Sequence, residues 1–210
     1  MIDSAAGQQA VKALGLSLSQ LLQQGLSGRG WDLSFDAALT AEIIRLPSYA
    51  YLIEQFDSVD IHAISEAIEC LPISLSAQLK SVMVDCYQQL RQQLESLGEY
   101  QPLADHVALR SLKNTCLAFL LRSLDSSLLH LAETQFDLAN NMTDQSSALS
   151  VLVNCPLENA EAAAQQRVDR FYQQWSSESL VVNQWLTVQA ASDKPGALGR
   201  VRALMDHEAY

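Results

Sequence analysis

The sequence contains little glycine and proline and no long apolar run. Only 8 of its 210 residues are glycine and 5 are proline, and no glycine lies between Gly30 and Gly98 or between Gly98 and Gly196. Stretches with so few turn residues leave little room for β-hairpins and favour long helices. The longest apolar stretch, residues 116–121, is far too short to cross a membrane, so we expect no membrane partner.

Positive charge is also scarce. The chain has 13 Lys and Arg against 24 Asp and Glu, a formal net charge of −11. Because nucleic-acid phosphates and anionic lipids attract clustered Lys and Arg, the sequence predicts neither as a partner. Hydrophobic residues make up 49% of the chain, which suffices for a packed core and argues against wholesale disorder.

The four cysteines (Cys70, Cys86, Cys116 and Cys155) are widely spaced and form no C-x-x-C motif. Each lies in an apolar helical pattern, where a free cysteine behaves as a small buried hydrophobic residue. A disulfide framework is not expected in a chain this long with so few cysteines. The first five residues lack the basic start and apolar run of a signal peptide. We therefore expect a cytoplasmic protein.

Several motifs that carry catalysis are missing from the sequence. It contains no H-E-x-x-H helix, no G-K-[ST] phosphate loop and no G-x-S-x-G elbow. His207-Glu208 begins like a zinc-protease motif, but no second histidine follows before Tyr210. Gly25, Gly28 and Gly30 have the wrong order for a dinucleotide loop, and a flexible link is expected there.

His130 and Glu133 stand at positions i and i+3 of a predicted helix and so share one face, where they could hold a metal ion. A structural zinc ion normally needs four ligands, and no third or fourth is visible nearby. We predict a surface pair, and a metalloenzyme that uses these two residues is a third hypothesis beside the two given below. We assign no catalytic, cofactor-binding or metal-binding residue.

Apolar residues at three- and four-residue spacing predict helices over nearly the whole chain. The expected spans are about 5–26, 35–45, 48–55, 60–72, 73–97, 106–123, 125–139, 144–154, 156–175, 179–191 and 196–207. Ser34, Asp60, Asp125 and Thr143 are the expected N-caps, Gly98 is the expected C′ residue, and Pro156 is expected at a first helical position. Apolar residues cover most of the helix over 106–123, so we place that helix, with Phe119, at the centre of the core.

Many antiparallel helices on short links are typical of either a stacked α-α superhelix or a bundle. No 34- or 40-residue repeat is visible, and no heptad pattern is sustained long enough for a coiled coil. We expect residues 1–210 to form one helical domain, to which residues 1–30 contribute a helix and a Gly-rich link.

The segment Ala139–Asp144 reads A-N-N-M-T-D. Asn140 or Asn141 can adopt the left-handed conformation that ends a helix, and Thr143 can cap the next helix. Met142 is flexible enough to fill the gap between the two helices. A tight corner between helices explains all four residue types, and contact with a peptide substrate is the alternative.

This segment and its neighbours resemble the C-terminal helical domain of bacterial aminopeptidase N, a zinc enzyme that trims residues from peptide N-termini. The resemblance is strongest from Ser111 to Leu204, where A-E-T-Q-F (132–136), L-V-V-N-Q-W (180–185) and V-R-A-L-M (201–205) accompany A-N-N-M-T-D. It continues more thinly through residues 41–60, and the first thirty residues match only by being helical. Of the two architectures, the resemblance implies the irregular α-α superhelix, a right-handed solenoid-like stack of antiparallel helices.

The family performs its chemistry with an H-E-x-x-H helix, a distant Glu and a G-A-M-E-N strand, and none of these occurs here. The resemblance therefore implies a non-catalytic domain that walls the cavity over the active site and restricts the entry of substrates. Zinc and catalysis would belong to the catalytic domain of the parent chain. That domain and the peptide substrates of the parent enzyme are the implied partners.

In the family the superhelix continues beyond the point that corresponds to the last residue here. We therefore expect the helix over 196–207 to present Val201, Leu204 and Met205 to helices that are absent, and the chain to fray or self-associate through that end. The competing hypothesis is a free-standing helical adaptor that binds protein partners on a concave face. The reading frame discriminates between the two, because the enzyme interpretation needs upstream codons for H-E-x-x-H.

Overall fold

The computed structural model describes residues 4–28, 30–192 and 194–210. In these residues the chain is helical without a β-strand, and a single isolated bridge joins Leu26 to Trp31. The predicted all-α fold is confirmed. The chain divides into two compact units, Met1–Ser123 and Leu124–Tyr210.

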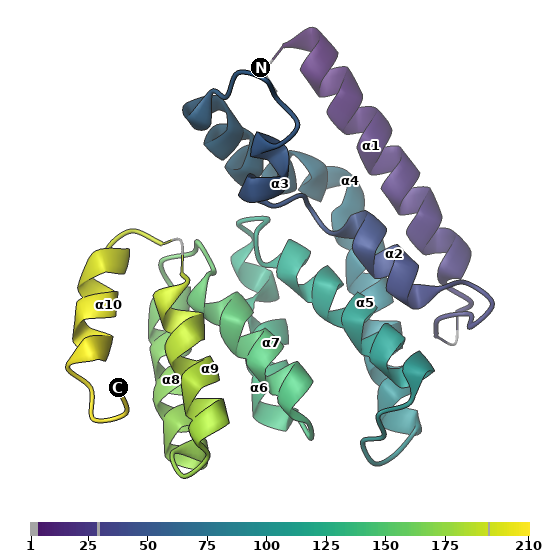
Figure 1. The fold of residues 1–210 in the computed structure, drawn as a ribbon. Helices are drawn as coiled ribbons and strands as arrows, with labels where there is room; N and C mark the ends of the chain where they lie inside the picture. The colour runs from purple at the N-terminus through teal and green to yellow at the C-terminus, as the bar shows by residue number, and fades with distance from the viewer. Residues whose placement is uncertain (1–3, 29, 193) are drawn as a thin grey trace. The chain divides into compact units, whose positions relative to one another are not determined.

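The first unit, Met1–Ser123, is built around one long helix. Its helices are α1 (Ala5–Gly25), α2 (Ala37–Ile44), α3 (Tyr49–Ile53), α4 (Ile61–Ser96) and α5 (Ala104–Leu120). Helices α1, α3 and α5 all pack against α4, and α2 packs against α5 (Figure 1). As predicted, α5 is central, because Leu109, Leu112, Cys116 and Phe119 on it are all buried.

Helix α4 continues through Pro72, so the predicted helix end at that residue is wrong. Proline has no N–H to donate to the carbonyl of Ile68, which costs a helix interior about 3 kcal/mol. Apolar side chains on both sides of the proline offset this cost, since Ile64, Leu75 and Leu79 are buried, as is Pro72 itself. The tertiary contacts of α4 therefore decide its length.

The most apolar 18-residue window of α4 has a mean hydropathy of 1.2, and 28% of that window is buried. By length and composition α4 is thus a candidate to cross a membrane. The longest uninterrupted apolar run in the sequence, residues 116–121, is by itself too short to do so. One candidate helix is weak evidence, because a core helix of a soluble protein passes the same test. The absence of a membrane partner stays a prediction.

The start of α2 differs from the expected cap. Asp36, and not Ser34, is the N-cap, and its Oδ1 accepts the N–H of Leu39 at 2.9 Å. The N–H of Ser34 is donated instead to Asp32 Oδ1, at 2.9 Å, in a turn before the helix. The hydrogen bonds from Ser34 hold the pKa of Asp32 below its usual value.

The described part of the Gly-rich segment is anchored to α4, although a flexible link was expected. The N–H of Gly30 is donated to Gln89 Oε1 at 3.2 Å, and the N–H of Trp31 to Gln93 Oε1 at 2.7 Å. Arg29 in this segment and residues 1–3, where a signal peptide was sought, lie outside the described residues.

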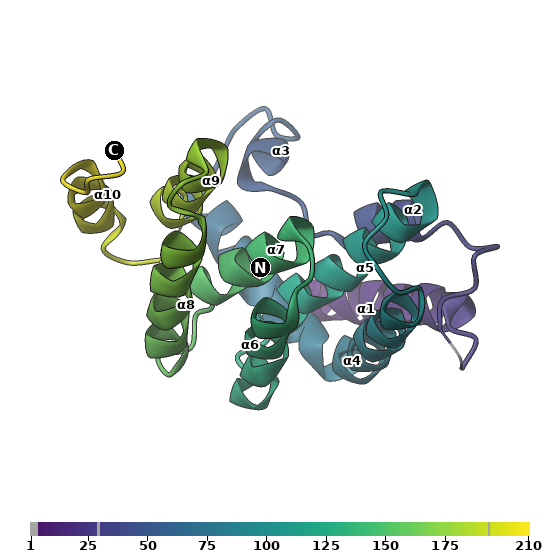
Figure 2. The ribbon, with the colours of Figure 1, turned by 90° about the horizontal axis from the view of Figure 1, so that it is seen from below.

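The second unit, Leu124–Tyr210, packs its helices around an aromatic core. It contains a 3₁₀ turn (Ser126–Leu128), α6 (Leu129–Leu138), α7 (Met142–Val153), α8 (Ala160–Trp175), α9 (Ser179–Ala190) and α10 (Ala197–Met205). Helix α7 contacts α6, α8 and α9, and α9 also packs against α8 and α10 (Figure 2). The buried core consists of Phe136, Ala148, Leu149, Val168, Phe171 and Trp185.

Three sequence predictions about the second unit have different outcomes. Two concern the starts of helices and the third concerns the exposed face of α10. Asp125 accepts the N–H of Ser127 at 2.9 Å, so its capping role is confirmed. Pro156 does not open a helix, because residues 155–157 are irregular, residues 158–159 form a turn and α8 begins only at Ala160. Leu204 on α10 packs against the aromatic core, whereas Met205 is exposed, so the predicted outward face of three residues is only partly correct.

The four cysteines, all within the described residues, form no disulfide, and Cys86, Cys116 and Cys155 are buried as expected for small hydrophobic residues, while Cys70 is half-buried. A hydrogen bond with Cys86, together with burial, raises the pKa of the Cys116 thiol well above its usual value. Burial also raises the pKa of Cys155.

Candidate functional site

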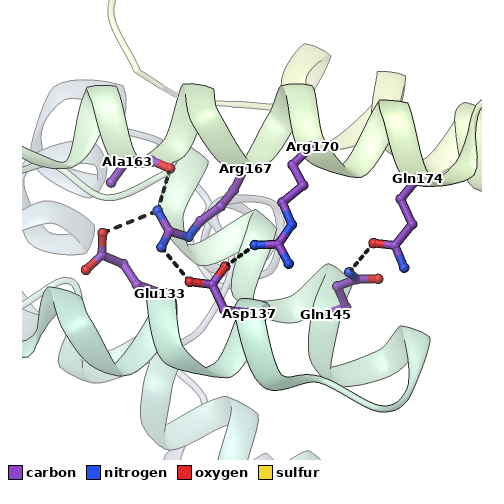
Figure 3. A network of polar contacts seen from close by, with 7 residues as sticks. All are labelled: Glu133, Asp137, Gln145, Ala163, Arg167, Arg170 and Gln174. Atoms are coloured by element: carbon purple, nitrogen blue, oxygen red, sulfur yellow. Dashed lines mark hydrogen bonds and ion pairs between the residues drawn. The ribbon is translucent and has the colours of Figure 1, made fainter.

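The densest group of charged contacts in the second unit joins α6 to α8 through Arg167. One guanidinium nitrogen, Nη2, lies 2.8 Å from Asp137 Oδ2, and the other, Nη1, lies 3.3 Å from Glu133 Oε1. Nη1 also donates to the carbonyl of Ala163 at 3.2 Å. Arg170 reaches the second oxygen of Asp137, Oδ1, at 3.0 Å, which completes the network in Figure 3.

Helical spacing puts these four charges on two facing surfaces. Glu133 and Asp137 stand at i and i+4 on α6, and Arg167 and Arg170 stand at i and i+3 on α8. The Arg167 side chain is only 11% exposed, so its charge must be paired to remain inside the protein. Both carboxylates are engaged by guanidinium groups, and the network therefore fastens the two helices together.

A second polar contact between helices lies nearby on α7 and α8. Gln145, which is buried, donates its Nε2 to Gln174 Oε1 at 3.1 Å (Figure 3). Its own Oε1 accepts the indole N–H of Trp175, also at 3.1 Å. Both polar atoms of the Gln145 side chain therefore have a hydrogen-bond partner, as a buried polar group requires. The two bonds fix the spacing of the two helices.

The A-N-N-M-T-D segment forms a corner between α6 and α7, but with a different cap. Asn141, with φ −150°, is the N-cap of α7, and its Oδ1 accepts the N–H of Asp144 at 2.9 Å. Neither asparagine is left-handed, and Thr143 lies inside the helix, so both of these details were wrong. The amide of Asn141 also donates to Asp144 Oδ2 at 3.0 Å, and this second bond favours asparagine at the cap.

The structure gives His130 and Glu133 separate partners. The Nδ1 of His130 lies 2.7 Å from the carbonyl of Ser127, while Glu133 pairs with Arg167. Among the residues that the structure describes, no three His, Cys, Asp or Glu side chains gather as metal ligands would.

His207 and Glu208 dock the end of the chain onto α8 and α9. The His207 ring lies 4.9 Å from the ring of Tyr172 and 5.0 Å from that of Trp185, measured between centroids. Tyr172 donates its hydroxyl to Glu208 Oε1 at 3.2 Å, and desolvation, followed by this bond, raises the pKa of Tyr172. The role of these two residues is packing, and sequence analysis missed it because aromatic contacts between distant residues leave no local pattern.

The comparison with protein families matches residues 3–210 to a domain of unknown function (DUF3458_C) with ARM repeats. Such repeats are units of two or three helices, about 40–47 residues long, that stack into superhelices. The match confirms the superhelical fold class. No fixed period is visible in the sequence because helix lengths vary from 5 residues in α3 to 36 in α4.

Curated relatives are bacterial aminopeptidases N. The chain is 35% identical over 179 residues to that of Escherichia coli (strain K12) and 30% identical over 181 residues to that of Caulobacter vibrioides. The matches cover 85% and 84% of this chain but only 20% of each relative. The chain thus spans about a fifth of the length of the curated relatives that it matches.

A solved aminopeptidase structure is similar to this chain over nearly its whole length. The crystal structure of Legionella pneumophila aminopeptidase A in complex with aspartic acid matches 98% of this chain and 26% of its own, with a TM-score of 0.70 and 25% identity. Together, the matches confirm the predicted resemblance to the C-terminal domain of aminopeptidase N and support a non-catalytic part of a peptidase.

Proposed function

This chain belongs to the family of the DUF3458_C domain with ARM repeats, and we propose that it walls the cavity over the active site of a zinc aminopeptidase. There it restricts which substrates enter. The zinc ion and the reaction belong to the catalytic domain of the parent chain. We further propose that the parent enzyme is cytoplasmic and acts on peptide N-termini.

One observation carries this proposal. At 35% identity, 85% of the chain aligns with a protein named aminopeptidase N, of which it covers only 20%. The four-fifths outside the match is where the catalytic centre must lie if the proposal is correct. The charged groups of the second unit agree with a scaffold role, because Glu133, Asp137, Arg167 and Arg170 are all engaged with one another.

The chemistry of the chain suits a wall that selects peptides. Packed helices hold their shape without a ligand, because most of them bury an apolar face against their neighbours. The net charge of −11 makes the potential near the chain negative. Such a wall attracts the cationic amino group at a peptide N-terminus and repels acidic peptides.

The first experiment compares two proteins, the full product of the reading frame and residues 1–210 alone. We expect the full product to hydrolyse an amino-acid p-nitroanilide and to lose this activity when its zinc is chelated. Residues 1–210 should show none. A reading frame that encodes no peptidase, or residues 1–210 that hydrolyse the anilide unaided, would contradict the proposal and, in the first case, favour the adaptor.

A second experiment tests the restriction of access. The same N-terminal residue is presented to the full product on an anilide, on an unstructured peptide and at the end of a folded protein. A walled cavity admits the first two and excludes the third. If the folded protein is trimmed as fast as the peptide, the chain does not restrict access.

A further inference from the structure

In the first unit an apolar segment lies on the surface with nothing packed over it. Helix α3 contains no buried residue. Four large apolar side chains in and beside it are exposed, namely Tyr51 (56%), Phe56 (56%), Val59 (38%) and Ile61 (59%). We call these four residues the α3 face. All four lie within residues 51–61, so this short segment exposes several large apolar side chains, where a single one would be ordinary.

Side-chain caps at its two ends, together with packing against α4, hold this segment in shape. Ser48 Oγ accepts the N–H of Tyr51 at 3.2 Å at the start of α3, and Asp60 Oδ1 accepts the N–H of Ala63 at 3.0 Å at the start of α4. Helix α3 also packs against α4 (Figure 1). The α3 face is therefore presented on a capped backbone, which lowers the entropic cost of binding.

Along the sequence, the charged residues next to the α3 face have one sign, as far as Arg45 on one side and Lys80 on the other. Between residues 46 and 79 the chain has no Lys or Arg, and its five ionisable carboxylates are Glu54, Asp57, Asp60, Glu66 and Glu69. A second copy of the chain on this face would bring like charges together, and an anionic lipid surface would repel them. The surface that fits is an apolar patch bordered by Lys or Arg.

We infer that the α3 face docks the remaining polypeptide of the parent enzyme. This inference rests on the proposed function and names the contact by which the domain is held. The relatives are long enough to supply such a partner, since the matched residues are only 20% of the Escherichia coli protein and 26% of the Legionella pneumophila chain. The apolar side chains would be removed from water at the interface, and the carboxylates would meet cationic groups at its rim.

Hydroxyl-radical footprinting of Tyr51 and Phe56 tests this inference. Their oxidation rates are measured by mass spectrometry in residues 1–210 alone and in the full product of the reading frame. We expect both side chains to react at least tenfold more slowly in the full product. Equal rates in a full product that hydrolyses the anilide would overturn this inference and leave the proposed function standing. A reading frame without a peptidase would overturn both.

Two further arms distinguish other occupants of the face. Protection that develops in residues 1–210 alone as their concentration rises would assign the face to a second copy. Protection of residues 1–210 by vesicles of phosphatidylcholine and phosphatidylglycerol would assign it to a membrane. Either result overturns the inference.

A pair of variants provides the functional control. The double variant Y51S/F56S replaces two exposed side chains, so residues 1–210 should melt at an unchanged temperature. In the full product we expect the same variant to lower the melting temperature. The matched variant L180S, at a residue that is 83% exposed in the second unit, should leave it unchanged. If Y51S/F56S leaves the melting temperature of the full product unchanged, the α3 face is not the docking surface.

Discussion

At Gly25 the indole of Trp31 occupies the space in which any other residue would carry its Cβ. A Cβ added to Gly25 would lie 2.2 Å from an atom of the Trp31 ring, and Trp31 is itself buried. The indole N–H of Trp31 is donated to the carbonyl of Phe35 at 2.9 Å, and Gln93 binds its backbone, so the ring has little freedom to move. Glycine is therefore needed here for close packing.

We predict that G25A lowers the free energy of unfolding by about 1–3 kcal/mol, the usual cost of an overpacked site. Urea unfolding followed by circular dichroism measures this. The control is G199A in α10, where no atom lies within 4 Å of the added Cβ. Alanine favours a helix interior over glycine by about 0.8–1.0 kcal/mol, so G199A should stabilise the chain. A neutral G25A would mean that Trp31 is not fixed.

Because the pKa of Tyr172 is raised, we predict that the stability of the folded chain depends on pH in the alkaline range. Its pKa is higher in the folded protein than the usual value of about 10, because the ring is desolvated and its hydroxyl binds Glu208. The folded state thus holds this proton more tightly than the unfolded state does. The stabilisation is complete below about pH 10 and is lost as the pH rises through the folded-state pKa.

The difference in melting temperature between the wild type and Y172F measures this contribution. We expect the difference to be constant near neutral pH and to change as the pH rises above 10, because phenylalanine has no proton to lose. Parallel melting curves for the two proteins across the alkaline range would show that Tyr172 does not couple to the docking of His207 and Glu208.

At the scale of elements, the pairing of α6 with α8 depends on one partly buried charge. Arg167 is 11% exposed and Asp137 is 34% exposed, whereas the Arg170 side chain is 56% exposed. Removing Arg167 leaves two carboxylates facing each other without their shared cation. We predict that R167A costs about 2–3 kcal/mol, somewhat less than a fully buried pair because solvent screens Asp137.

The matched variant R170A should cost less than about 1 kcal/mol, since exposed ion pairs contribute little. Both are measured by urea unfolding at low and at high salt. Equal effects of the two variants would show that burial of Arg167 does not set its contribution.

The approximate spans of most helices follow from apolar spacing, but their ends depend on competition between caps. Ser34 and Thr143 are good N-caps by type, yet Asp36 and Asn141 hold those positions. Ser34 is engaged by Asp32, and Asn141 makes a second bond to Asp144. These alternatives differ by about 1 kcal/mol or less, which sequence cannot resolve.

At the scale of the whole molecule, each of the two units has its own buried core. Leu75, Leu79, Met83, Leu112 and Phe119 are buried in the first, and Phe136, Leu149, Phe171 and Trp185 in the second. We predict that residues 1–123 and 124–210, expressed separately, are each helical and melt cooperatively. Circular dichroism measures both properties. A separate unit that lacks a melting transition would show that its core is not sufficient.

Within residues 1–123, F119A should cost about 3–5 kcal/mol, because the phenyl ring is buried on the central helix α5. The exposed residue Val107 on the same helix gives the control V107A, which should cost less than about 1 kcal/mol. A cost below 1 kcal/mol for F119A would show that α5 is not central.

The order of residues by itself determined the all-α fold, the central position of α5 and the absence of a recognisable catalytic motif, because each depends on local spacing along the chain. The family also followed from it, through segments such as A-N-N-M-T-D. Only the tertiary structure decided that α4 passes through Pro72, that Arg167 joins α6 to α8 and that the α3 face is uncovered. Each of these outcomes depends on which distant residues share a surface, and no spacing within a single helix encodes that.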